Sequence, residues 1–178
     1  MNKLYKLFLA FNSTYLIIVI YLINKNYVLI LLENKPNYYS HLIFVMMPVL
    51  LTLLSFLLLN FLDNDEIKKE NILEVELANN TFLPTYLGYF FVSLSISNLE
   101  TLVFIFLIIY VFTFLSQTLY FNPIFLLFRY NFYFLTNSDN VKIFLITKKQ
   151  IIHPKEFDFN HLKRINDYTF IDTQKKHL

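Results

Sequence analysis

The chain has 178 residues with a formal net charge of +2, and 56% of its residues are hydrophobic and 19% aromatic. Its mean hydropathy is +0.48, and an ordinary soluble domain is only about 45–50% apolar, so the composition predicts a small polytopic membrane protein. The absence of cysteine excludes disulfides, thiolate metal sites and thiol nucleophiles, and a single glycine excludes a glycine-rich phosphate loop.

Four uncharged apolar segments are long enough to cross a bilayer, which takes about 20 residues. They predict spans over residues 6–24, 41–62, 83–99 and 101–121. The segments are apolar on every side, which favours lipid over the amphipathic packing of a soluble helical protein. A signal peptide is the alternative for the first segment, but no small-x-small cleavage site follows it, so we expect an uncleaved helix.

The basic residues predict how the spans are oriented. If both termini are cytosolic, every Lys and Arg except Lys25 and Lys35 lies inside the cell. The predicted fold class is therefore an α-helical integral membrane protein. It would consist of a four-span bundle over residues 1–128 and a cytosolic α+β tail over residues 129–178.

Small side chains gather in the third predicted span. Ser93 and Ser97 stand four residues apart, on one face of a helix, and Gly88 lies in the same segment. Because lipid gives helices no hydrophobic reason to associate, small residues that allow close approach matter. We expect Gly88, Ser93 and Ser97 to pack helices together. The short connection at residues 97–101 predicts an antiparallel hairpin of the third and fourth spans, with Glu100 as a solvated turn residue.

The predicted cytosolic loop at residues 63–82 is rich in acids, which we interpret as a charged, solvated segment and not as part of a pocket. Within it, Leu73, Val75 and Leu77 alternate with glutamates, which predicts a half-buried strand over residues 71–77. A helical step through the same loop remains an alternative.

The chain leaves the predicted membrane between Pro123 and Arg129. Proline disfavours helix at the preceding residue, so we expect the fourth span to end or kink at Pro123. After Arg129, two aromatic and β-branched runs flank a polar turn at residues 137–140. This pattern predicts a β-hairpin over about residues 130–147.

A lone hairpin is marginally stable, so a further strand is expected, either from residues 167–172 or from residues 71–77. Residues 157–165 could form a short helix, with Asp158 as a possible cap. The basic side chains of this tail fit positive-inside anchoring. They would also suit the anionic headgroups of membrane lipid, a cytosolic protein or nucleic acid.

Sequence motifs for catalysis are missing. The chain has no HExxH or serine-elbow motif, and His153 and His161 stand eight residues apart on the tail, which does not suit a metal site. No charged pair lies within the predicted spans, as proton relays usually require. We therefore expect no enzyme activity, no cofactor and no metal.

Several stretches of the second half follow the pattern of a known family. They are YLGYFFVSLSI at residues 86–96, FNPIFLLF at 121–128 leading into YNFY, FLITKK at 144–149 and KRINDYTFID at 163–172. In their order and local sequence, over roughly residues 70–172, they resemble the KwaA family, the membrane subunit of the bacterial Kiwa antiphage defence system. The chain departs from the expected pattern at Arg129, where a small residue would suit a tight turn.

The resemblance implies a multi-pass protein of the bacterial inner membrane that assembles with copies of itself. It would sense infection and recruit a cytosolic, DNA-binding effector subunit, without binding nucleic acid directly. The alternative is a small oligomeric channel or pore-forming membrane toxin. We expect the partner to dock on the cytosolic tail, through Arg129, Tyr130, Phe132, Lys142, Lys148, Lys149, Lys163, Arg164, Asp167 and Tyr168.

Overall fold

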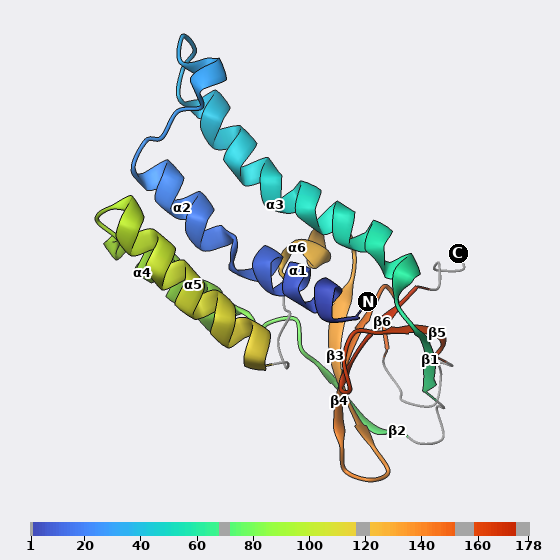
Figure 1. Ribbon diagram of the computed structural model, residues 1–178. Coiled ribbons are helices and arrows are strands. Elements are labelled where there is room, and N and C mark those ends of the chain that lie inside the picture. Colours follow the sequence, from blue (N-terminus) through green and yellow to red (C-terminus); the bar gives the residue numbers. More distant parts are fainter. Residues whose placement is uncertain (1, 68–71, 117–121, 152–158, 174–178) are drawn as a thin grey trace. The chain divides into compact units, whose positions relative to one another are not determined.

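A computed structural model describes residues 2–67, 72–116, 122–151 and 159–173 (Figure 1). It contains a six-stranded mixed sheet together with apolar helices. The chain therefore has an α+β fold.

The chain divides into two compact units, each made of separate stretches of sequence. The sheet unit comprises Met1–Lys6, Leu58–Thr81 and Pro123–Leu178, and the helical unit comprises Leu7–Leu57 and Phe82–Asn122. The acidic loop and the tail are far apart in the sequence but belong to one unit.

The strands of the sheet lie in the order β1-β5-β6-β4-β3-β2. All neighbouring strands are antiparallel except β4 and β6, which are parallel. The strands are β1 (Asn64–Ile67), β2 (Ile72–Leu77), β3 (Asn131–Asn137), β4 (Lys142–Thr147), β5 (Phe159–Arg164) and β6 (Thr169–Asp172).

Strands β3 and β4 pair antiparallel where the sequence predicts a hairpin, with Phe134 opposite Phe144. The Asn137 side chain shapes the turn, because its Oδ1 accepts hydrogen bonds from the backbone N–H groups of Asp139 and Val141, each at 2.9 Å. Both segments considered for a further strand are used: β2 pairs with β3, and β6 pairs with β4.

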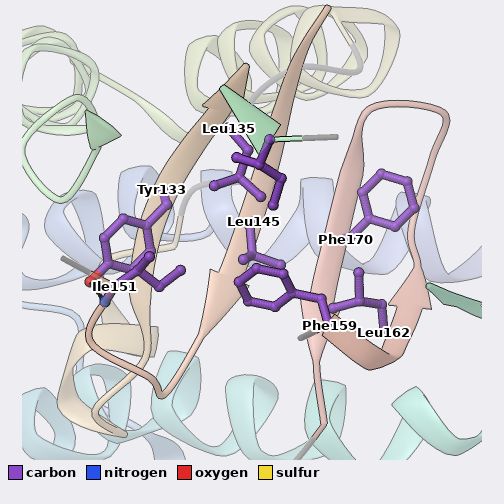
Figure 2. Packing of buried hydrophobic residues seen from close by; sticks show 8 residues of the cluster. Tyr133, Leu135, Leu145, Ile151, Phe159, Leu162 and Phe170 are labelled. Carbon is purple, nitrogen blue, oxygen red and sulfur yellow. Dashed lines mark hydrogen bonds between the residues drawn. The ribbon is translucent and has the colours of Figure 1, made fainter. Parts of the chain in front are cut away.

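The sheet must curl strongly, because its two edge strands are close neighbours in the sequence. Strands about 4.8 Å apart would place β1 and β2 about 24 Å apart in a flat sheet. Five residue steps from Ile67 to Ile72 can span only about 17 Å. The curled sheet encloses one apolar cluster that takes residues from all six strands, part of which Figure 2 shows. Its buried members are Ile72, Tyr133, Leu135, Leu145, Ile151, Phe159, Leu162 and Phe170, with Ile67, Val75 and Ile143 packed against them.

The other face of β3 and β4 is also covered. Phe132 is completely buried and stacks on Phe144, with ring centroids 5.7 Å apart. Phe125, from the short helix α6 (Ile124–Leu127), lies 6.3 Å from the Phe132 ring. Burial on both faces explains why β4 is a nearly continuous apolar run and not an alternating one.

The expected helix at residues 157–165 is wrong, because Phe159–Arg164 forms strand β5. Phe159 and Leu162 stand three residues apart, a helical spacing, yet both are buried in the core of the sheet. The reason is a register shift against β1, in which Asp65 pairs with Leu162 and Ile67 with Phe159. The extra residue of this bulge turns two side chains at a spacing of three toward the same face.

The other helices are built almost entirely from uncharged apolar residues. Tyr15 interrupts the first of them, where the Ser13 and Thr14 hydroxyls both donate to the Ala10 carbonyl oxygen, each at 2.9 Å. The helices are α1 (Asn2–Thr14), α2 (Leu16–Asn24), η1 (Ile30–Leu32), α3 (Tyr38–Leu58), η2 (Leu59–Phe61), α4 (Leu83–Ser95) and α5 (Leu99–Ser116).

The four-span helical bundle expected from the sequence is wrong. Besides the six-stranded sheet, three helical stretches of the described chain are long and apolar enough to cross a membrane: Lys3–Asn24, Tyr38–Phe61 and Leu99–Ser116. Helix α4 has 13 residues, or about 20 Å of helix against about 30 Å of hydrocarbon. The Asn98 side chain explains its early end, because Oδ1 accepts a bond from the Thr101 N–H at 2.8 Å and caps the next helix.

Candidate functional site

A pocket of about 440 Å³ opens on the sheet unit, next to the turns that follow β3 and β5. Its apolar walls come from Ile67, Val141, Ile143, Tyr168 and Phe170. Phe170 also belongs to the enclosed apolar cluster, where Figure 2 shows it beside Leu162. The pocket is therefore an opening at one end of the core, and its walls are held by the sheet itself.

An ion pair forms one side of the pocket. Arg164 Nε lies 2.8 Å from Asp65 Oδ2, and its guanidinium group lies over the Phe170 ring, 5.6 Å from the centroid. The Arg164 side chain is 46% exposed and that of Asp65 28%, so the pair contributes at most about 1 kcal/mol to stability. In this pair, Asp65 balances the charge of Arg164, which is the one cationic side chain among the described residues of the wall.

Two further carboxylates of the pocket, Glu66 and Asp167, are exposed and form no ion pair with another described residue. Asp167 is held at the tip of the β5–β6 turn by the buried Asn166, whose Oδ1 accepts a bond from the Tyr168 N–H at 2.8 Å. Among the described residues of the pocket, the carboxylates therefore outnumber the cations, and they lie beside an aromatic ring, since Tyr168 is 53% exposed.

Three of the predicted docking residues, Arg164, Asp167 and Tyr168, come together at this pocket. Lys163 points elsewhere, because its Nζ donates to the Leu62 carbonyl oxygen at 2.9 Å. This bond and the Arg164–Asp65 pair hold β1 against β5.

A second group of predicted docking residues surrounds a buried carboxylate. Asp172 is 2% exposed, and its Oδ2 accepts a bond from the Thr147 hydroxyl at 2.9 Å and lies 3.4 Å from Lys149 Nζ. Burial, with the Asp172 charge adding to it, raises the pKa of Tyr130 to about 12. Lys148 Nζ lies 4.8 Å from the centroid of the Tyr130 ring. Because Tyr130 and Asp172 are buried, this cluster orders the sheet more than it offers a surface.

The remaining predicted docking residues are scattered. Phe132 is buried and has no surface for a partner. Lys142 pairs with Glu76 at 3.5 Å, away from the pocket, and both side chains are more than half exposed. Arg129 is exposed at the end of α6 with φ 62°, a left-handed backbone conformation.

The three predicted helix-packing residues differ from one another. Ser93 is completely buried and its Oγ donates to the Ile17 carbonyl oxygen at 2.7 Å. Gly88 faces open space, since a Cβ added there would meet no atom within 4 Å. Ser97 lies beyond the end of α4 and is exposed, so it does not share a helix face with Ser93.

The interpretation of the loop acids as a purely solvated segment is wrong for Asp65 and Glu66, which line the pocket. They lie on β1, whose four residues are too short for an alternating pattern to stand out. The preceding Asp63-Asn64 reads as the polar end of an apolar helix. Asp65 and Glu66 line the pocket only because β1 pairs with β5.

A buried polar group in the helical unit was also missed. Thr52 Oγ1 accepts bonds from the side-chain amides of Asn12, at 3.1 Å, and Asn122, at 2.9 Å. It donates in turn to the Pro48 carbonyl oxygen at 2.8 Å. Such polar contacts hold apolar helices together in lipid. Single Asn and Thr residues within apolar segments are the available sequence signal, but the sequence does not show which of them meet.

No group of three or more His, Asp or Glu side chains is placed to hold a metal ion within the described ranges of the chain. The pocket as described offers carboxylates, one paired guanidinium and aromatic rings. These groups suit recognition of a cationic group.

Of three comparisons with known proteins, one found a match. Searches of curated proteins and of solved structures found none. A protein-family model described as anti-phage protein KwaA matches residues 5–171, nearly the whole chain, so the protein belongs to the KwaA family.

Proposed function

We propose that this antiphage protein is anchored in the bacterial inner membrane and holds a cytosolic effector protein on its sheet unit. The effector would be the DNA-binding component of the defence system, and the membrane-anchored protein would relay a signal of infection to it. The observation that carries the proposal is a pocket in which Glu66 and Asp167 form no ion pair with another described residue. The pocket is built on a folded unit of a chain with membrane-compatible helices.

The helices support the membrane part of the proposal. Helix α5 is apolar on all sides, and only 6% of its Leu99–Ser116 window is buried within the protein. Side chains such as Phe104, Phe112 and Leu115 are more than 60% exposed. A soluble protein rarely leaves so large an apolar surface uncovered, whereas lipid covers it without cost.

The charges support a cytosolic sheet unit. Every Lys and Arg of the chain except Lys25 and Lys35 belongs to that unit. Basic segments are retained on the cytoplasmic side of bacterial membranes. The sheet unit would therefore face the compartment in which an effector could act on phage DNA.

Copurification tests this proposal. The tagged chain is produced in bacteria together with the soluble protein encoded next to it, and the membranes are extracted with an uncharged detergent. We expect the neighbouring protein to be retained by the full-length chain. Deleting residues 137–178 would be a poor test, because it removes β4, β5 and β6 and destroys the sheet.

Liposomes that contain only this protein test the alternative function, a membrane pore. If they released an enclosed dye while no neighbouring protein was retained, the protein would be a small oligomeric pore and the recruitment proposal would be wrong.

A further inference from the structure

We infer that the pocket of the sheet unit binds an arginine side chain of the partner protein. The inference rests on the proposed function, because it assumes that a protein docks on this unit. It adds the chemistry of the contact and names the residues that make it.

The shape of the pocket suits a long side chain with an apolar stem. Its volume of about 440 Å³ is at the lower end of the range of roughly 300–1,000 Å³ that is common for binding sites. Ile67 of β1 and the nearby pair Val141 and Ile143 at the start of β4 form apolar walls from two segments of the chain. The methylene groups of an arginine can be buried against such walls while the charged end stays near the rim.

The charges at the rim select a cation. Arg164 already pairs with Asp65 at 2.8 Å, whereas Glu66 and Asp167 pair with no other described residue. An incoming guanidinium group could therefore bind carboxylates that need no rearrangement. The described wall carries three carboxylates against one guanidinium group, which favours a cation over a phosphate group.

The aromatic rings favour arginine over lysine. Tyr168 is 53% exposed at the rim, and Phe170 already carries the planar guanidinium group of Arg164 at 5.6 Å. A second guanidinium group can stack on Tyr168 and bind a carboxylate in a forked geometry, which an ammonium group cannot do. In the existing contact, the Arg164 guanidinium group already lies over the Phe170 ring, 5.6 Å from its centroid.

The first experiment uses the absence of tryptophan from the chain. Tyr168→Trp places a single tryptophan at the rim of the pocket, in the full-length protein in uncharged detergent. N-acetylarginine amide and the neutral analogue N-acetylcitrulline amide are titrated, and the tryptophan fluorescence is recorded. We expect saturable binding of the arginine compound, weakened by salt, and at least tenfold weaker binding of the citrulline compound.

Near-isosteric variants in the same background locate the binding. Glu66→Gln with Asp167→Asn should weaken arginine binding at least tenfold, whereas the matched change Glu74→Gln, on an exposed acid of β2, should leave it unchanged. Equal affinity for the two compounds, or unchanged affinity in the double variant, would overturn the inference.

The second experiment separates this inference from the proposed function. Glu66→Lys with Asp167→Lys is compared with Glu74→Lys in the copurification assay, after equal thermal stability has been established. We expect the double variant to lose at least nine-tenths of the retained partner and the control to keep it. Full retention of the partner by the double variant would show that the pocket inference is wrong, and the recruitment proposal would be unaffected. If the unmodified chain retained nothing, recruitment would fail, and the titration alone would decide whether the pocket binds arginine.

Discussion

Arg129 shows how one residue can carry backbone strain at the boundary of a helix. It follows α6 with φ 62°, and the bonds from Arg129 N to Leu126 O, at 2.9 Å, and from Tyr130 N to Phe125 O, at 3.1 Å, close the helix end. The Phe125 and Tyr130 rings pack 5.8 Å apart across this end. This is the Schellman arrangement, in which glycine is preferred at the left-handed position. The tight turn exists although the residue in it is not small.

Replacement of Arg129 tests the cost of this conformation. We expect Arg129→Gly to unfold at a higher temperature than Arg129→Ala, by about 1 kcal/mol in stability, because a Cβ is disfavoured in the left-handed region. Both variants lose the charge, so the difference isolates the backbone. Thermal unfolding followed by circular dichroism in neutral detergent measures it, and equal melting temperatures would show that the turn is unstrained.

At the scale of one element, the two small residues Ser93 and Gly88 of helix α4 differ in whether they contact another helix. Two of its hydroxyl groups bind backbone carbonyls of the Lys3–Asn24 segment: Tyr86 donates to Ser13 at 3.0 Å and Ser93 to Ile17 at 2.7 Å. The small side chain of Ser93 therefore allows a close contact, whereas Gly88 contacts nothing nearby.

Three substitutions in and after α4 separate these roles. Ser93→Leu should destabilise the helical unit by about 1–3 kcal/mol, because a larger side chain must fit a filled position. Gly88→Ala should be neutral or stabilise by up to about 1 kcal/mol through helix propensity. Ser97→Leu, on an exposed residue outside the helix, serves as the control. Unfolding with increasing SDS measures each effect, and a Gly88→Ala loss as large as that of Ser93→Leu would contradict this assignment.

At the scale of the whole molecule, strand pairing constrains the membrane topology that we propose. β2 precedes α4 and β3 follows α5, and the two strands are paired. In the proposed arrangement, the α4–α5 segment would therefore begin and end on the same side of the membrane. β1 follows α3 and belongs to the same sheet, so the end of α3 would lie on that side as well.

Single cysteines can test this arrangement, because the chain has none of its own. Asn34→Cys lies in the exposed connection between α2 and α3, and Asp139→Cys lies in the exposed β3–β4 turn. In spheroplasts, we expect a membrane-impermeant maleimide to label position 34 at once and position 139 only after permeabilisation. Immediate labelling of position 139 would place the sheet unit outside the cell and contradict a cytosolic partner.

Local patterns explain which predictions succeeded. The β3–β4 turn is determined by Asn137 and its neighbours. A strand is present where the alternation over residues 71–77 predicts one, as β2, but its predicted half-buried face is wrong, because Leu73 and Leu77 are 60% and 61% exposed. The third span failed because apolarity was counted across residues 96–98, where an extended Ile96 and a capping Asn98 end one helix and begin another. The helix expected at residues 157–165 failed because a bulge gave a strand the spacing of a helix.

The sequence by itself was enough to predict the apolar helices, the central hairpin and the family. Hydropathy, turn residues and family motifs are all properties of residues that are neighbours in the sequence. Only the tertiary structure decided that β1 joins β5, that Asp65 meets Arg164, and that Glu66 and Asp167 share one pocket. Those contacts join segments far apart in the chain. They depend on sheet order and on the curl of the sheet, which no local pattern of residues specifies.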